Sequence, residues 1–364
     1  MSTHPRAVDA RKVGIAALAA HPDRIDVRSP SEFAIDHIPG AVSLPVLDDA
    51  QRAEVGTLHA QVSAFDAKQR GAAIVSRNIA TILETFCQGK PPDWSPLVYC
   101  WRGGKRSGAL AHVLSEIGWR AVQLDGGYLT YRRHVVATLA TLPMRFRYVV
   151  VCGLTGSGKS RLLAALAGAG EQVLDLETLA RHRGSLLGDL PGDPQPSQKR
   201  FDSDLLGTLT RFDPARPVYV ESESRKIGTI QVPETLLGAM RDARCIRVAT
   251  AHPHRIALLK EEYAHFLSDA EALAGKLHHL ASLHGHKTIG RWSDAARIGD
   301  FDMVIDELLV QHYDPTYARS IERNFARISD ALTVVPSGID ASAFDEAAQE
   351  IVRHVGMQSP ETVT

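Results

Sequence analysis

Short apolar runs, separated by polar loops and amphipathic stretches, recur along the first third of the chain. The segments IDV, PLVYC and AVQL have the length and apolar character of buried strands. ALAHVLSEIGW, which follows PLVYC and a glycine-rich loop, has the spacing of a helix. An alternation of strand, loop and helix is typical of a parallel sheet with crossover helices. We therefore predict an α/β domain over residues 1–138.

A second series of the same kind begins after the helical stretch HVVATLATLPMRFR. RYVVVCGL, VLDL, PVYVES and CIRVAT are predicted strands separated by helical stretches, and they indicate a second α/β domain over residues 139–255. From 256 to 335 apolar residues recur every three or four positions and predict a helical region. A C-terminal segment, 336–364, follows, and we expect its end, MQSPETVT, to be disordered.

The composition favours a globular protein with several domains. The chain has 364 residues, of which 44% are hydrophobic and 23% charged. No apolar run approaches the roughly 20 residues that span a membrane, and MSTHPRAVDARK lacks the features of a signal peptide. The formal net charge is -1, so a nucleic-acid partner would be held by local basic patches.

The four cysteines are Cys87, Cys100, Cys152 and Cys245, and they form no CxxC pair. Free thiols suit the reducing cytoplasm, where we place the protein. We expect Cys152 and Cys245, which lie in predicted strands, to pack in the core. Core packing is also the favoured interpretation for Cys87, with a resolving thiol for Cys100 as the alternative.

Cys100 lies where a predicted strand ends in C-W-R-G-G-K-R-S-G, directly before a helix. Gly103 and Gly104 let the backbone turn tightly and expose its N–H groups, which form an anion nest with the helix N-terminus. Basic side chains follow around this loop: Arg102, Lys105 and Arg106. Such surroundings favour the thiolate, which is the nucleophile. We therefore predict that Cys100 is a catalytic residue that carries or attacks a transferable sulfur or selenium atom.

Residues 153–160, G-L-T-G-S-G-K-S, match the phosphate-binding pattern G-x-x-x-x-G-K-[ST] between a predicted strand and a predicted helix. Backbone N–H groups would surround a diphosphate, Lys159 would reach its terminal phosphate and Ser160 would ligate Mg²⁺. The predicted phosphate-binding residues are Gly153, Thr155, Gly156, Ser157, Gly158, Lys159 and Ser160. An acidic partner is expected at a neighbouring strand end. The candidates are Glu221 and Glu223 and, with weaker support, Asp175 and Glu177.

These two loops, in this order, resemble the bacterial tRNA 2-selenouridine synthases, which join a rhodanese domain to a P-loop domain. The segment I-D-V-R-S-P-S-E-F-A-I-D-H-I-P-G-A is similar to the early motif of rhodanese domains. Other similar segments are L-D-G-G-Y, L-E-T-L-A-R-H-R-G-S, Q-P-S-Q-K-R-F, V-E-S-E-S-R-K-I-G and Y-D-P-x-Y. The resemblance extends over about residues 25–317, nearly the whole chain.

The resemblance implies a transferase that acts on the wobble 2-thiouridine of the tRNAs for Lys, Glu and Gln. Geranyl diphosphate would first alkylate the sulfur, and selenophosphate would then displace the geranylthiol and leave 2-selenouridine. In the family the cysteine that corresponds to Cys100 is required for the selenium step. A selenophosphate-producing enzyme is an implied partner, and we expect no tightly bound cofactor beyond Mg²⁺.

The spacing from Cys100 to Arg106 is C-x5-R, one residue longer than the C-x4-R of common sulfur-transferring rhodaneses, and it resembles that of dual-specificity phosphatases. Because selenophosphate is close to phosphate in size and charge, we assign it to this cysteine loop. We assign geranyl diphosphate to the P-loop, where ATP is the competing ligand. The helical segment from Leu258 to Leu283 would supply an apolar slot for the geranyl chain.

Other enzyme classes fit parts of this pattern. One alternative is a rhodanese-type sulfurtransferase fused to an ATP-dependent kinase, which the P-loop allows. Another is a cysteine-dependent phosphatase, although Tyr99 stands where such enzymes usually have His. A regulatory binding module is less favoured, because inactive rhodanese domains typically lack the cysteine that corresponds to Cys100.

Basic side chains in the family-like segments are the predicted tRNA contacts, because RNA binding needs positive surface. They are Arg181, Arg183, Lys199, Arg200, Arg225 and Lys226. A looser basic run comprises Arg241, Arg244, Arg247 and Arg255. Four histidines also lie close together in the sequence: His278, His279, His284 and His286. No carboxylate or cysteine completes a metal-ligand set with them, so we prefer a surface or RNA-facing role.

Overall fold

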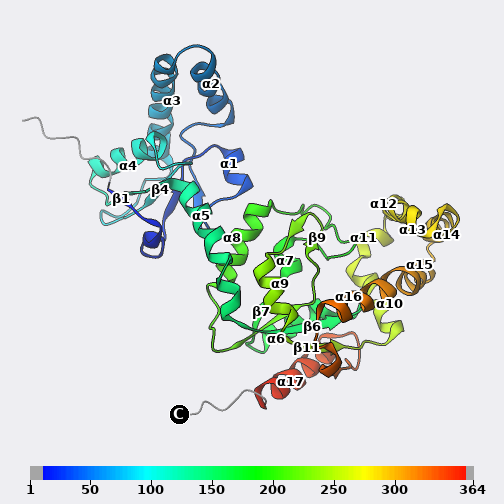
Figure 1. Ribbon diagram of the computed structural model, residues 1–364. Coiled ribbons are helices and arrows are strands. Elements are labelled where there is room, and N and C mark those ends of the chain that lie inside the picture. The colour runs from blue at the N-terminus through cyan, green and yellow to red at the C-terminus, as the bar shows by residue number, and fades with distance from the viewer. Residues whose placement is uncertain (1–10, 358–364) are drawn as a thin grey trace, which may run out of the picture. The chain divides into compact units, whose positions relative to one another are not determined.

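The computed structural model describes residues 11–357, which form two compact units (Figure 1). The first unit contains the chain up to residue 139 together with 196–207, and the second contains 140–195 and the chain from 208 onward. The expectations for MSTHPRAVDARK and MQSPETVT fall mainly on residues 1–10 and 358–364, outside the described residues. Within the described part, no helix is long and apolar enough to cross a membrane.

A five-stranded parallel sheet in the order β1-β5-β4-β2-β3 forms the first unit's centre. Its strands are β1 (Lys12–Val13), β2 (Arg24–Asp26), β3 (Ala41–Ser43), β4 (Leu97–Tyr99) and β5 (Val122–Leu124). From β2 the chain passes to β3 on one side and then to β4 on the other. The ends of β2 and β4 therefore flank a topological switch point, the usual ligand site of an open α/β sheet. Cys100 follows β4 at this point.

Helices pack on this sheet and enclose a core built from apolar residues of β2, β4, α3 and α4, including Ile25, Val98 and Leu110. The helices are η1 (Ile15–Ala20), α1 (Pro30–Ile35), α2 (Asp49–Gln61), α3 (Ala64–Thr85), α4 (Lys105–Ile117) and α5 (Gly127–Leu139). Ser29 and Glu32 form a capping box at the start of α1. Helices α2 and α3 pack together as a hairpin (Figure 1).

Most of α8 (Gln198–Leu209) belongs to the first unit, although the sequence division places it in the P-loop domain. The Ser203 hydroxyl donates a hydrogen bond to the Asp36 carboxylate at 3.1 Å. Arg200 contacts the His37 ring at 2.6 Å. These contacts join polar groups more than 160 positions apart, so no local pattern announces them.

A second five-stranded parallel sheet, ordered β12-β11-β6-β8-β7, forms the centre of the second unit. Its strands are β6 (Arg147–Gly153), β7 (Gln172–Leu174), β8 (Pro217–Glu221), β11 (Arg244–Val248) and β12 (Leu332–Val334). Strand β6 is central, and the chain continues to β7 and β8 on one side before β11 forms on the other. The loop after β6 therefore lies at a switch point, and this loop carries residues 153–160.

The remaining elements of this unit are helices and one small hairpin of β9 (Lys226–Ile227) and β10 (Ile230–Gln231). The helices before β11 are η2 (Leu142–Arg145), α6 (Lys159–Gly168), α7 (Leu176–Ala180) and α9 (Glu234–Arg241). Those after β11 are α10 (His252–Glu262), α11 (Ala264–Leu267), α12 (Ala270–Leu277), η3 (His278–Leu280), α13 (Ala281–His284), α14 (His286–Arg297), α15 (Phe301–Leu308), η4 (Leu309–Tyr313), α16 (Asp314–Asn324), η5 (Ile328–Asp330) and α17 (Ala341–Met357). Helices α10 to α16 share a core centred on the buried Trp292.

The predicted α/β class, with two parallel sheets and a helical region, is confirmed. The structure adds an edge strand, β12, and helix α17, which packs against α6 through Phe344 and Ile351. Residues 256–357 lie in the second unit.

Candidate functional sites

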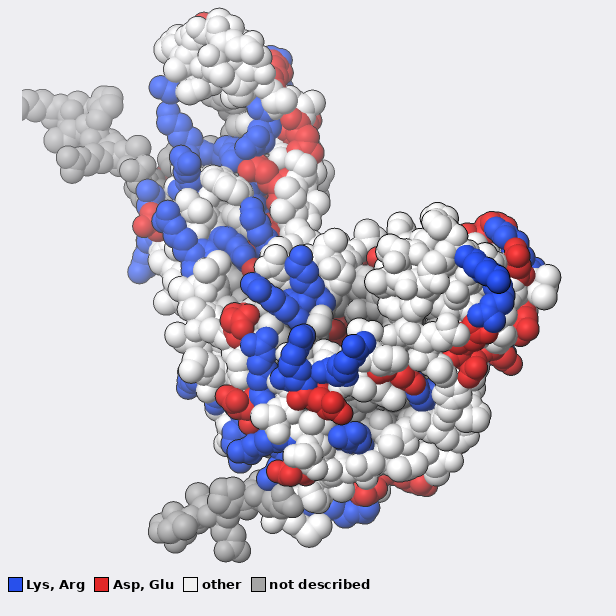
Figure 2. All heavy atoms as spheres, turned by 45° about the vertical axis from the view of Figure 1, so that its right-hand side comes forward, with Lys and Arg blue, Asp and Glu red and all other residues white. Residues whose placement is uncertain are grey.

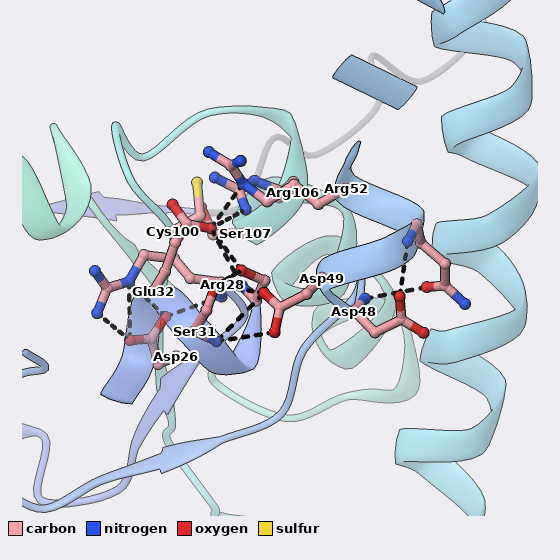
Figure 3. Close-up of polar contacts among 12 residues, drawn as sticks. Asp26, Arg28, Ser31, Glu32, Asp48, Asp49, Arg52, Cys100, Arg106 and Ser107 are labelled. Carbon is pink, nitrogen blue, oxygen red and sulfur yellow. Dashed lines mark hydrogen bonds and ion pairs between the residues drawn. The ribbon is translucent and has the colours of Figure 1, made fainter. Parts of the chain in front are cut away.

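Cys100 is almost fully buried at the base of its loop, and two donors point at its sulfur. The backbone N–H of Gly104 lies 3.3 Å from Sγ and the Ser107 hydroxyl 3.1 Å from it (Figure 3). Gln123 in turn donates to the Ser107 hydroxyl at 2.8 Å, which orients that hydroxyl toward the sulfur. Hydrogen bonds from such donors stabilise a thiolate. The sequence analysis did not single out Ser107, although it follows Arg106 directly.

The glycines of L-D-G-G-Y pack against this loop. A Cβ on Gly127 would lie 2.2 Å from the Cys100 carbonyl oxygen, and one on Gly103 would lie 2.4 Å from the Leu124 carbonyl oxygen. Both residues also have positive φ values, 58° and 60°. Only glycine fits these positions, so the two motifs together set the shape of the cysteine loop.

Some charged residues around the cysteine loop form ion pairs, and others are exposed to solvent. Arg106 donates to Glu32 at 3.0 Å, and Arg52 also pairs with Glu32 (Figure 3). Burial raises the pKa of Glu32, but the two arginines outweigh it and hold this pKa below its ordinary value. Arg102 and Lys105 are exposed. The loop therefore keeps two solvated cations, while Arg106 is held in place by a carboxylate.

The second predicted loop wraps the end of β6 and the start of α6. Gly158 begins α6 with a φ of 79°, and a Cβ there would lie 2.4 Å from the Phe344 ring. Lys159 folds back so that Nζ donates to the Gly153 carbonyl oxygen at 3.1 Å. Among the described residues, the buried hydroxyls of Thr155 and Ser157 have no hydrogen-bond partner. Unsatisfied buried donors in such a loop point to an anionic ligand.

Several carboxylates lie near this loop. They include Glu177, which had weaker support in the sequence than Glu221 and Glu223. Ser160 donates to Glu177 at 3.2 Å, and Glu177 and Glu223 both approach Gly184. Burial, followed by the neighbouring Glu177, raises the pKa of Glu223 to about 8. Glu221 instead accepts the N–H groups of Leu176 and Glu177 at 2.6 and 2.8 Å.

Glu221 therefore fixes the start of α7. Asp175 caps the same helix through the Thr178 N–H and also lines the cavity described next. Among the described residues, no three Asp, Glu, His or Cys side chains form a metal-ligating group. Ser160 and Glu177 still fit Mg²⁺, which proteins usually hold through one or two side chains, waters and substrate phosphates.

A cavity of about 400 Å³ opens at the phosphate loop. Its lining includes the charged residues Lys159, Glu177 and Glu223. Apolar or aromatic side chains line it as well, and they are Ala164, Leu190, Leu259, Tyr263 and Tyr317. Leu259 and Tyr263 lie within the segment that the sequence analysis proposed as an apolar slot. The cavity therefore combines a phosphate loop with apolar and aromatic side chains.

Arg255 connects the phosphate loop to the Y-D-P-x-Y motif. Its Nε donates to the Thr155 carbonyl oxygen at 2.9 Å, and its two terminal nitrogens pair with Asp314 at 2.5 and 3.0 Å. Asp314 begins α16, which carries Tyr317 into the cavity. The sequence analysis placed Arg255 only in a loose basic run, because the partner lies 59 positions away.

The six predicted tRNA contacts lie in different environments. Arg181 pairs with Asp193, Arg183 stacks on the Tyr263 ring and Arg200 pairs with Asp204. Lys199 lies 5.8 Å from the centre of the Trp101 ring, beside the cysteine loop. Arg225 and Lys226 are exposed and line a second cavity. Figure 2 shows Lys and Arg side chains clustered near the centre of the face in view, so the net charge of -1 hides local basic areas.

The remaining thiols and histidines have other surroundings. Cys87, Cys152 and Cys245 are free and buried, as expected for core residues. The His284 ring contacts His312 at 3.1 Å and lies near Trp292, and the His278 ring faces His286. His278, His279 and His286 are exposed, as predicted for surface residues, whereas His284 is half-buried and packs within the helical region.

Comparison with known proteins connects both loops to one family. A model described as the tRNA 2-selenouridine synthase AAA domain matches residues 146–286, and a rhodanese-like domain model matches residues 15–134. The tRNA 2-selenouridine synthase of Cupriavidus necator is 32% identical over 89% of this chain and 94% of its own length. The chain belongs to the tRNA 2-selenouridine synthase family.

Other family members match over shorter regions. The tRNA 2-selenouridine synthase of Nitrosomonas europaea is 34% identical over 66% of this chain, and the match spans 63% of that protein. The one from Aeromonas salmonicida is 36% identical over 67% of this chain and 65% of its own length. Family membership confirms the resemblance that the sequence motifs indicated.

Proposed function

We propose that this protein converts wobble 2-thiouridine in tRNA to 2-selenouridine in two steps at two anion-binding sites. Its relatives carry the name of that activity, and the tRNAs for Lys, Glu and Gln are the proposed substrates. The observation that carries the proposal is the cavity at the phosphate loop, because one cavity combines a diphosphate cradle with apolar side chains.

In the first step, geranyl diphosphate occupies this cavity. The thiouridine sulfur attacks the first carbon of the geranyl group; the C–S bond forms, the C–O bond to diphosphate breaks and the base loses its N3 proton. Lys159 and the loop N–H groups stabilise the departing diphosphate. Mg²⁺, if held by Ser160 and Glu177, would add positive charge to that leaving group.

Geranyl diphosphate is favoured over ATP by the apolar part of the cavity lining. Leu190, Leu259 and Tyr317 present apolar surface to a ligand, which suits a ten-carbon chain. ATP remains the competing ligand because P-loops commonly bind nucleoside triphosphates. Hydrolysis of ATP that tRNA stimulates would favour the kinase-like alternative over geranyl transfer.

In the second step, selenophosphate occupies the cysteine loop. Selenium bonds to carbon 2 of the base while the C–S bond breaks and geranylthiol leaves with a proton; water then cleaves the P–Se bond and releases phosphate. The exposed Arg102 and Lys105 attract the anion. Cys100 is required for this step, and its sulfur is held by the Gly104 and Ser107 donors.

Two variants separate the steps, and mass spectrometry of the wobble nucleoside reads both. Cys100→Ala should accumulate S-geranyl-2-thiouridine and make no 2-selenouridine. Lys159→Ala should leave 2-thiouridine unmodified, while added S-geranylated tRNA should still receive selenium. Formation of 2-selenouridine by Cys100→Ala would refute the role of the cysteine, and normal geranylation by Lys159→Ala would refute the diphosphate site.

A further inference from the structure

A second cavity, of about 610 Å³, adjoins the phosphate cavity at Glu223. Glu223 lines both cavities, and it is the one residue that the two linings share. The second cavity is built by the loop after β8, the β9–β10 hairpin, α9 and the end of α16. Helix α16 also carries Tyr317 in the phosphate cavity, so both cavities use this helix.

The rim of the second cavity is strongly basic. It carries Arg225, Lys226, Arg241 and Arg323, and its only acidic residue is Glu223. Arg241 pairs with Glu234 at 3.0 Å. Arg225, Lys226 and Arg323 are exposed, and within residues 11–357 none of the three forms an ion pair with a side chain. Unpaired cations on a concave surface favour an anionic ligand.

The rest of the lining indicates what kind of anion fits. Leu237, Met240 and Phe325 are buried and supply the apolar part of the lining, against which a base can pack only at its edges. Ser320, Asn324 and Ser224 add hydroxyl and amide groups that can bond base edges or sugar. A small inorganic anion would leave most of the cavity empty, whereas a nucleotide with its flanking phosphates uses the apolar part of the lining, the polar groups and the rim.

We propose that this cavity binds single-stranded RNA, and that it holds the wobble nucleotide of the anticodon loop with its base directed toward Glu223. This proposal rests on the proposed function, because Glu223 also lines the cavity assigned to geranyl diphosphate. The base in the second cavity and the geranyl group in the first would then meet across this residue. Arg225, Lys226 and Arg323 bind the flanking phosphates.

The test uses the full chain and an anticodon stem-loop RNA with 2-thiouridine at the wobble position. Binding is measured by fluorescence anisotropy over a range of salt concentrations, without geranyl diphosphate. The double variant Lys226→Ala/Arg323→Ala should bind about tenfold more weakly, and its salt slope should fall by about 1.4, since each single-strand phosphate contact contributes about 0.7. The matched control is Lys287→Ala/Arg353→Ala, which removes one exposed Lys and one exposed Arg that line neither cavity.

A second arm tests the base. A stem-loop with an abasic wobble position should bind the unaltered protein about tenfold more weakly than the thiouridine RNA, because the contacts of the base with the cavity lining are lost. Equal binding of both RNAs, or equal effects of the two double variants, would overturn the proposal. Geranyl diphosphate binding, measured by calorimetry without RNA, should be unchanged in Lys226→Ala/Arg323→Ala. If the unaltered protein transfers no geranyl group to an RNA that it binds in this cavity, the proposed function fails while the RNA site stands.

Discussion

Replacing Asp314 by Asn tests whether the buried Arg255 couples the phosphate loop to α16. Asn has nearly the shape of Asp, so the change removes a charge and leaves the packing in place. Arg255 is 5% exposed, and besides Asp314 it contacts the Thr155 carbonyl oxygen. Loss of the carboxylate therefore leaves a buried cation whose remaining partners are neutral.

The loss of stability in Asp314→Asn depends on how well water can replace the lost carboxylate beside Arg255. Removing one member of a fully buried ion pair costs about 3–5 kcal/mol, whereas an exposed pair contributes about 0–1 kcal/mol. The Asp314 side chain is 26% exposed, but Arg255 is not, so water reaches only one side of the pair. We expect Asp314→Asn to lower the free energy of unfolding of the second unit by about 2–3 kcal/mol.

Urea unfolding followed by hydrogen exchange in α10 and α16 measures this loss. The matched control is Asp302→Asn, which removes the carboxylate of the exposed Lys260–Asp302 pair in the same helical region. That control should cost less than about 0.5 kcal/mol. Because Arg255 also holds Thr155, Asp314→Asn should weaken geranyl diphosphate binding as well. An Asp314→Asn variant as stable as the Asp302→Asn control would refute the coupling.

Two further predictions concern the cysteine loop and the acidic cluster. Ser107→Ala removes a hydroxyl that donates to the Cys100 sulfur, so alkylation of this thiol by iodoacetamide should slow about tenfold. The control Ser115→Ala, on the same helix, should have no effect on the alkylation rate. Equal rates in the two variants would count against the role of the Ser107 hydroxyl. Glu223 has a folded-state pKa of about 8, above its ordinary 4.5, so the folded protein binds the extra proton and the free energy of unfolding should fall as pH rises between these values. In Glu223→Gln the free energy of unfolding, measured by urea unfolding with a chelator present, should depend less on pH over this range. The same dependence on pH in the variant and the unaltered protein would contradict the raised pKa of Glu223.

The sequence alone was sufficient for features that a local pattern encodes. The cysteine loop and the phosphate loop are visible in the sequence because each consists of glycines between a strand and a helix, all within about a dozen residues. Apolar runs predicted four strands of the second sheet. Strand β12 was not predicted, because its pairing with β11 is a contact between segments more than 80 positions apart. The family resemblance also came from short motifs, and the comparisons confirm it.

Contacts between distant segments could be decided only by the tertiary structure. The strand-end pattern favoured Glu221 as the acidic partner, but the fold brings Glu177 to Ser160 and uses Glu221 to fix α7. The fold likewise joins Arg255 to Asp314 and builds the second cavity from three separate stretches of chain. A sequence pattern reports the period and turns of one segment; it does not report which side chains the packing of several segments brings within hydrogen-bonding distance.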